Sequence, residues 1–107
     1  MTIEITARHM HATKALQDYA ERKAEELAEE FPRIEFVHVI LDVEKHLRIA
    51  EVCVQARGHV RVETRQETDN LKVSIEQAFD KVEKQLRKLA DKAHDHKPAM
   101  KRGREVR

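Results

Sequence analysis

The feature that most constrains the fold of this chain is a long apolar stripe with helical spacing in its C-terminal third. Apolar residues recur there every three or four positions for about six turns, which predicts one amphipathic helix. They are Ile75, Phe79, Val82, Leu86, Leu89 and Ala93. Such a helix needs an apolar surface to cover, because packing supplies most of its stability. We expect Thr68 or Asp69 to cap its start, and Pro98 is the last point at which it can end.

The residues that precede this helix supply the surface as four predicted strands. Apolar and polar residues alternate, with the period of a half-buried strand, over 2–8, 36–43, 50–57 and 59–65. The second of these segments is apolar on both faces near its middle, which suits a central strand. Gly58 makes a short turn easy between the last two, so the last three strands are predicted to form an antiparallel meander.

Another amphipathic helix is predicted between the first two strands, with Thr13 as its N-cap and a stop at Pro32. The element order is therefore β-α-β-β-β-α, an α+β fold. Each helix has one apolar stripe, and both stripes are buried if the helices pack on one face of a four-stranded sheet. That arrangement is like a double-stranded-RNA-binding domain. We expect residues 1–97 to form a single domain and 98–107 a mobile basic tail.

The charge of the chain is uneven along its length. Residues 1–79 hold 11 Lys/Arg against 15 Asp/Glu, whereas residues 80–107 hold 10 against 5, so basic charge gathers at the C-terminal end. A single cysteine cannot form an internal disulfide, and no apolar run approaches the ~20 residues of a membrane span. The N-terminus lacks the regions of a signal peptide. We expect a cytoplasmic protein without membrane contact.

On a helical wheel the charges of residues 69–95 are sorted by flank. With Val82 at zero and about 100° per residue, the apolar stripe lies within about 80°. Four lysines share an edge between about 200° and 280°, whereas the acids lie between about 100° and 180°. Among the basic residues of this C-terminal half of the helix, only Arg87 lies on the acidic side. The four lysines are Lys81, Lys84, Lys88 and Lys92. On the wheel alone, an ordinary solvated surface stays favoured over a nucleic-acid-binding edge, because it explains most charge runs.

The first predicted helix carries a smaller signal. Tyr19 and Lys23 share one edge at i, i+4, but most of the exposed surface of this helix is acidic, so alone it looks solvated. The edge gains significance as a nucleic-acid contact only if it adjoins the lysine edge of the second helix. Two helices on one sheet face would permit that contact.

Other kinds of site find little support in the sequence. The His9–His11 pair lies at or beyond a strand end, and the spacing of His94 and His96 splays the rings about 200° apart on a helix. Cys53 lies within a strand with no group placed to orient a nucleophile. Neither of the two glycines forms a phosphate-binding loop. We expect no metal, no cofactor, no small-molecule substrate and no catalysis.

Three segments carry a recognisable pattern: ITARH over 5–9, TKALQDYAERK over 13–23 and IEQAFDKVEKQLRK over 75–88. They resemble the ribosome hibernation promoting factors, also called ribosome-associated inhibitor A proteins and, under an older label, sigma-54 modulation proteins. The resemblance covers roughly residues 1–93. The fold of that family agrees with the element order derived above.

The resemblance implies a bacterial, non-enzymatic protein that binds small-subunit ribosomal RNA in the channel where tRNA and mRNA sit. It implies inhibition of translation under stress or in stationary phase. The residues to which RNA contact is carried over are Lys81, Lys84, Arg87, Lys88, Lys92, Tyr19, Lys23, Arg8 and His9. Lys72 stands where the family usually has a tyrosine, so no stacking contact is carried over to that position.

Several alternatives stay open at this stage. Long members of the family carry a C-terminal domain that dimerises and pairs ribosomes, and its absence makes this chain a short form or a piece of a long one. Whether it pairs ribosomes or blocks single ones does not follow from the residues. We expect a monomer when free. A second hypothesis is a protein-binding regulator of a transcription factor, as the older label suggests.

Overall fold

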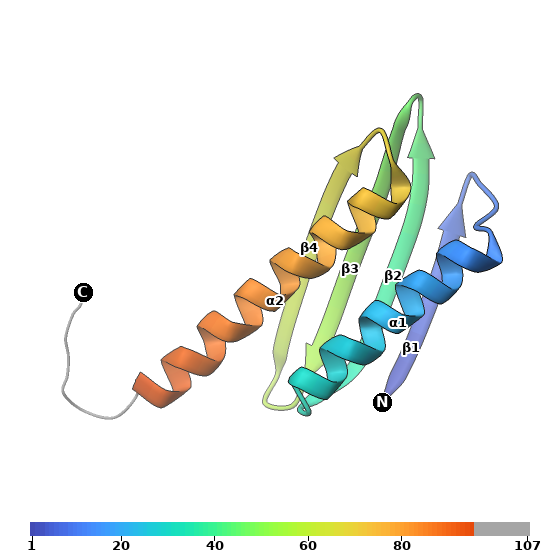
Figure 1. Ribbon diagram of the computed structural model, residues 1–107. Coiled ribbons are helices and arrows are strands. Elements are labelled where there is room, and N and C mark those ends of the chain that lie inside the picture. The colour runs from blue at the N-terminus through green and yellow to red at the C-terminus, as the bar shows by residue number, and fades with distance from the viewer. Residues whose placement is uncertain (96–107) are drawn as a thin grey trace.

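Four strands and two helices make up the described part of the chain (Figure 1). The structure, a computed structural model, describes the backbone of residues 1–95 and the side chains of residues 1–90. In chain order the elements are β1 (Thr2–Arg8), α1 (Lys14–Glu30), β2 (Ile34–Glu44), β3 (Leu47–Ala56), β4 (Val60–Thr68) and α2 (Leu71–Asp95). The predicted β-α-β-β-β-α order is confirmed. The predicted tail and the domain end at residue 97 lie outside the described residues.

The strands form one mixed sheet in the order β1-β2-β3-β4. Because α1 carries the chain back between them, β1 and β2 pair in parallel, with Ile5 opposite Val39. Tight turns join the other strands, which pair antiparallel, with His38 opposite Cys53. Gly58, with a φ of 85°, lies in the β3–β4 turn as predicted. The meander and the central position of β2 are also confirmed.

Both helices cover the same face of the sheet (Figure 1), and the core lies between them and the strands. Alternate strand residues point into this core, as the period of two requires. On the strands the fully buried residues include Val37, Val39, Leu41, Ala50 and Val54. Ala20 and Ala24 of α1 are also fully buried, and their small side chains let this helix lie close to the sheet. Each larger aliphatic side chain contributes roughly 1.5–3 kcal/mol by its burial.

Thr13 caps α1 as predicted. Its Oγ1 accepts a hydrogen bond from the Leu16 N–H at 3.1 Å, which satisfies one of the free donors at the start of the helix. At the other end the Phe31 N–H donates to the Leu27 carbonyl at 2.9 Å. Pro32 follows and cannot continue the ladder, because it has no N–H.

The predicted cap of α2 is wrong by one or two positions. Asn70, rather than Thr68 or Asp69, caps the helix, because its Oδ1 accepts from the Val73 N–H at 3.2 Å. Thr68 is the last residue of β4, and its Oγ1 accepts from the Asn70 N–H at 3.0 Å. The same hydroxyl lies 2.7 Å from Ser74 Oγ, which anchors the first turn of α2 to the end of the sheet.

The apolar stripe of α2 is buried only in part. Leu86 is 6% exposed, but Leu89, which the wheel predicts to face the sheet, is 43% exposed. Leu89 lies next to Val60 and Val62 of β4, which is an edge strand, so part of its side chain stays open to solvent. The C-terminal end of α2 projects beyond the sheet (Figure 1). Helical periodicity gives the direction of a side chain around the helix axis, but it does not say where the underlying sheet stops.

Candidate nucleic-acid interface

The acidic flank of α2, which we define as Glu76, Asp80 and Glu83, lies toward α1. Asp80 and Glu83 line a hollow of about 180 Å³ together with Lys23 and Leu27 of α1. Burial raises the pKa of the Glu83 carboxyl, and the neighbouring Glu30 raises it further. This flank is therefore part of the contact between the two helices rather than an outer surface.

Arg87 joins the two helices at the same place. Its Nη2 lies 2.7 Å from Glu30 Oε2 of α1 and 2.6 Å from Glu83 Oε2, one turn earlier on α2. The hydrogen bond from Arg87 holds the pKa of Glu30 below its ordinary value. The wheel separates Arg87 from the lysines, and in the structure it contacts two carboxylates, whereas no ion pair joins Lys81, Lys84 or Lys88 to another described residue.

The lysine flank of α2, which we define as Lys81, Lys84 and Lys88, has a different environment. All three side chains are exposed, and Lys88 lines a hollow with Arg61 and Val62 of β4. Within the described residues, none of the three forms an ion pair. Lys92 continues this edge by sequence, but its side chain lies outside the described ones. The flank presents a row of ammonium groups on the side of α2 away from α1.

Tyr19 lies at the centre of a group of cations between the helices. Lys72 Nζ is 5.1 Å from the centre of its ring, and Lys23 Nζ and Arg22 Cζ are 6.0 and 5.9 Å from it. These distances fall within the range of cation–π attraction. Burial, followed by the charges of Glu76 and Asp80, raises the pKa of the Tyr19 hydroxyl. The hydroxyl therefore stays protonated at neutral pH and can donate a hydrogen bond.

The Tyr19 group, which we define as Tyr19, Lys23 and Lys72, does not adjoin the lysine flank directly. The acidic flank lies toward α1, whereas Lys88 lies beside Arg61 and Val62 of β4. The packing thus brings Tyr19 and Lys23 beside the acidic flank of α2. Lys72 is not among the contact residues that the sequence predicts, because only the packing of α2 on α1 brings it to Tyr19.

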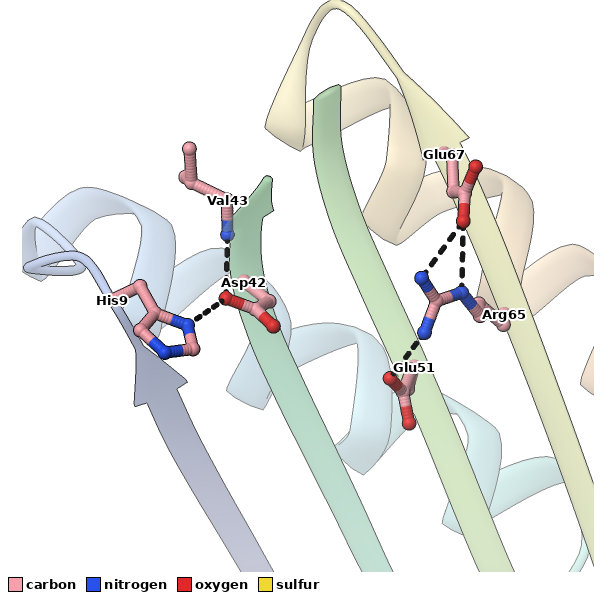
Figure 2. A network of polar contacts seen from close by, with 6 residues as sticks. All are labelled: His9, Asp42, Val43, Glu51, Arg65 and Glu67. Carbon is pink, nitrogen blue, oxygen red and sulfur yellow. Dashed lines mark hydrogen bonds and ion pairs between the residues drawn. The ribbon is translucent and has the colours of Figure 1, made fainter. Parts of the chain in front are cut away.

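Arg8 and His9 lie at the end of β1, at the opposite edge of the sheet from β4. His9 Nδ1 lies 2.9 Å from Asp42 Oδ1, which also accepts from the Val43 N–H at 2.8 Å (Figure 2). The hydrogen bond to His9, together with that from Val43, holds the pKa of Asp42 below its ordinary value. His9 adopts a φ of 57°, so the residue fixes the turn that leaves β1.

The open face of the sheet carries many charges that compensate one another. Arg65 contacts Glu51 of β3 at 3.0 Å and Glu67 of β4 at 2.8 Å, as Figure 2 shows. Arg61 similarly pairs with Glu63. To bind a nucleic acid, these arginines would have to give up a carboxylate partner for a phosphate. The open face is therefore a weaker candidate for anion binding than the lysine flank.

The centre of that face is covered by its own side chains. His38 Nε2 lies 2.9 Å from Thr6 Oγ1 on β1, and the rings of His38 and Phe36 are 6.0 Å apart. Burial raises the pKa of the Cys53 thiol, which is on the strand position opposite His38. Across the described residues, no group of three or more potential ligands is arranged to hold a metal. Nor is any helix in that part long and apolar enough to cross a membrane.

Residues 3–94 match the family described as Sigma 54 modulation protein / S30EA ribosomal protein. A ribosome hibernation promoting factor from Klebsiella oxytoca is 30% identical over 96 residues, which are 90% of this chain and 100% of the relative. Another from Azotobacter vinelandii is 33% identical over 92 residues, covering 86% of this chain and 85% of that protein.

Two solved structures have the same fold. One is a ribosomal subunit interface protein from Coxiella burnetii, with a TM-score of 0.79 and 23% identity, covering 85% of this chain and 99% of the other. The second is the N-terminal domain of Protein Y from Thermus thermophilus, with a TM-score of 0.74 and 27% identity, covering 83% and 99%. The mixed four-stranded sheet with two helices is thus shared.

Proposed function

The chain belongs to the Sigma 54 modulation protein / S30EA ribosomal protein family, and from that premise we propose that it binds the ribosome as a hibernation factor. Relatives that align with most of its length bear the name ribosome hibernation promoting factor. We propose further that it occupies the channel of the small subunit where tRNA and mRNA sit. There it would contact ribosomal RNA and inhibit translation by occupying the site, without catalysis, in the bacterial cytoplasm.

The lysine flank is the observation that supports RNA contact. Lys81, Lys84 and Lys88 span about 10 Å along α2 at 1.5 Å per residue. Like charges at i, i+4 cost an isolated helix roughly 0.2–0.5 kcal/mol per pair, and no carboxylate among the described residues offsets that cost here. Phosphate groups would neutralise the row, because each ammonium replaces a condensed counterion on the nucleic acid.

The Tyr19 group offers a second contact of a different kind. An aromatic ring can stack on an unpaired base, which contributes about 1–3 kcal/mol per base. The neutral hydroxyl can donate to a phosphate or base oxygen, and Lys72 adds a cation beside the ring. We therefore add Lys72 to the proposed RNA contacts Lys81, Lys84, Lys88, Tyr19 and Lys23. In this proposal Lys92 extends the flank and Arg8 remains a contact at the end of β1, whereas Arg87 and His9 contact carboxylates of the protein itself.

Chemical probing of purified small subunits tests the location. Saturating protein should protect ribosomal RNA nucleotides that line the tRNA and mRNA channel, and it should inhibit a cell-free translation reaction at the same concentrations. A variant with Lys84→Gln and Lys88→Gln should need a higher concentration for both effects. Protection confined to the outer surface of the subunit would contradict the proposal.

A pull-down with and without RNase separates this function from regulation of a transcription factor. Under the proposal, RNase treatment of a lysate removes the main partners of the protein. A principal partner that stays bound after RNase would favour a protein-binding role instead. The Lys84→Gln/Lys88→Gln variant provides the internal comparison, because it should lose the RNase-sensitive partners and keep any others.

A further inference from the structure

An apolar groove lies beneath the projecting end of α2, between the end of α1 and the β3–β4 turn. It encloses about 520 Å³. Its apolar lining includes Phe31, Ile34, Ala56, Val60, Leu86 and Leu89. The lysine flank and the Tyr19 group contribute none of these residues, so the groove is a separate feature of the surface.

Leu89 makes the groove a contact surface rather than a packing defect. It continues the stripe that buries Leu86, but it is 43% exposed because it lies beside the edge strand β4, with no further strand to cover its outer side. One wall of the groove is therefore the face of α2, with Leu86 and Leu89 at a spacing that packs against a second helix. Such a face fits a helical occupant that presents apolar residues at i, i+3 and i+4.

The charges at the rim are predominantly positive. Arg33 and Arg57 line the groove side by side, since the Arg57 N–H donates to the Arg33 carbonyl at 3.0 Å. In the part of the chain that the structure describes, neither guanidinium has a carboxylate partner. Glu30, the acid at this rim, is held by Arg87 at 2.7 Å.

This charge pattern discriminates between possible occupants. The residues that follow Asp95 in the sequence carry Lys97, Lys101, Arg102, Arg104 and Arg107 against Glu105, so they have the same sign as the rim. A second copy packed groove to groove about a two-fold axis would oppose the same arginines. RNA bases stack on aromatic planes, but this floor is aliphatic apart from Phe31. An acidic protein segment meets none of these objections.

We infer that the groove binds an acidic amphipathic helix of a partner protein, with its apolar residues on Leu86 and Leu89 and its carboxylates beside Arg33 and Arg57. The inference does not depend on ribosome binding, because it rests on a different surface. A protein that occupied a ribosome through the lysine flank could hold such a segment at the same time.

Two synthetic peptides of about 15 residues, long enough to hold some helix, provide the probe. Both carry leucines at i, i+3 and i+4; one has glutamate at its remaining positions and the other lysine. Each is titrated into the ¹⁵N-labelled full chain while amide shifts are recorded by NMR. The glutamate peptide should shift the amides around Phe31, Ala56 and Leu89, and the lysine peptide should not.

Variants assign the contact to the groove. Leu89→Asp should abolish these shifts, and Arg33→Glu with Arg57→Glu should weaken the apparent affinity for the glutamate peptide at least about tenfold. Val73→Asp is the matched control, because Val73 is also a partly exposed apolar residue of α2, at 37%, and lies at the other end of the helix. It should bind the glutamate peptide like the parent protein.

Several outcomes would overturn the inference. They are equal binding of both peptides, shifts that Leu89→Asp leaves in place, and no localised shifts at all. Shifts of the same amides on dilution without peptide would assign the groove to a second copy. Shifts caused only by a single-stranded RNA oligomer would assign it to nucleic acid. Co-sedimentation of Leu89→Asp with small subunits should match the parent, which separates failure here from failure of the proposed function.

Discussion

Arg87 of α2 and Glu30 of α1 form an ion pair with an Nη2–Oε2 distance of 2.7 Å, although they lie 57 positions apart in the chain. The same nitrogen lies 2.6 Å from Glu83 Oε2. One guanidinium therefore bridges two carboxylates from two helices, and this bridge lies on the acidic flank. The arrangement commits the acidic flank to the contact with α1 and leaves the lysine flank of α2 without compensating acids among the described residues.

We predict that Arg87→Gln lowers the melting temperature, because Glu30 and Glu83 are then left facing each other. Both carboxylates are solvent-accessible, so the shift should be no more than about 5 °C and should shrink as salt is added. Lys84→Gln removes the same charge from the same helix and serves as the control. Its melting temperature should be unchanged or slightly higher, and equal losses in the two variants would contradict the bridge.

Asn70→Ala should destabilise the protein by about 0.5–2 kcal/mol, because it removes the side-chain acceptor for the Val73 N–H. Asp69→Ala, one residue earlier, should change stability by less than about 0.5 kcal/mol. Urea unfolding of the two variants measures the difference. A larger loss of stability from Asp69→Ala than from Asn70→Ala would identify Asp69 as the N-cap, as the sequence predicts.

Two leucines of one stripe should differ sharply in their effect on folding. Leu86→Ala should cost about 2–5 kcal/mol, because the side chain is 6% exposed and its loss leaves a cavity. Leu89→Ala should cost less than about 1 kcal/mol, because its side chain already contacts water. Equal costs in urea unfolding would mean that the stripe is covered as far as Leu89.

The stability of the fold should depend on pH at acid values, because the pKa of Asp42 is lower in the folded state. Its folded-state pKa lies below the ordinary value of 3.8, mainly through His9, so the unfolded state takes up a proton first. The carboxylate therefore contributes stability that is present above about pH 4 and is lost as the pH falls through the folded-state pKa. Asp42→Asn should be less stable than the parent at pH 7, and the difference should narrow below about pH 4. Glu44→Gln, an exposed neighbour, is the control that should track the parent throughout.

Much of the fold was accessible from local sequence patterns. The period of two in β2 and the period of 3.6 in α2 arise within a few residues, so they can be read without knowing what lies opposite. The Thr13 cap and the Gly58 turn are local in the same sense. The exception among local features is the cap of α2, where Thr68, Asp69 and Asn70 are all suitable residue types and the end of β4 decides between them.

The features that escaped prediction depend on distant contacts. The wheel gave Leu89 the right direction but could not show that it lies at the edge strand of the sheet. The partners of Arg87 and the position of Lys72 beside Tyr19 follow from the way α2 lies on α1. Because the same packing turns the acidic flank toward α1, it is the acidic flank and not the lysine flank that lies next to the Tyr19 group.

The salt dependence of small-subunit binding tests the central claim most directly. Co-sedimentation over a salt series at constant magnesium gives the slope of log affinity against log salt concentration. Each lost phosphate contact reduces the steepness of this slope by roughly 0.7–0.9, so Lys84→Gln with Lys88→Gln should reduce it by about 1.4–1.8 and weaken binding. Lys45→Asn with Arg65→Gln removes two positive charges elsewhere and should leave the slope unchanged. Identical slopes for the parent and the lysine-flank variant would contradict the account.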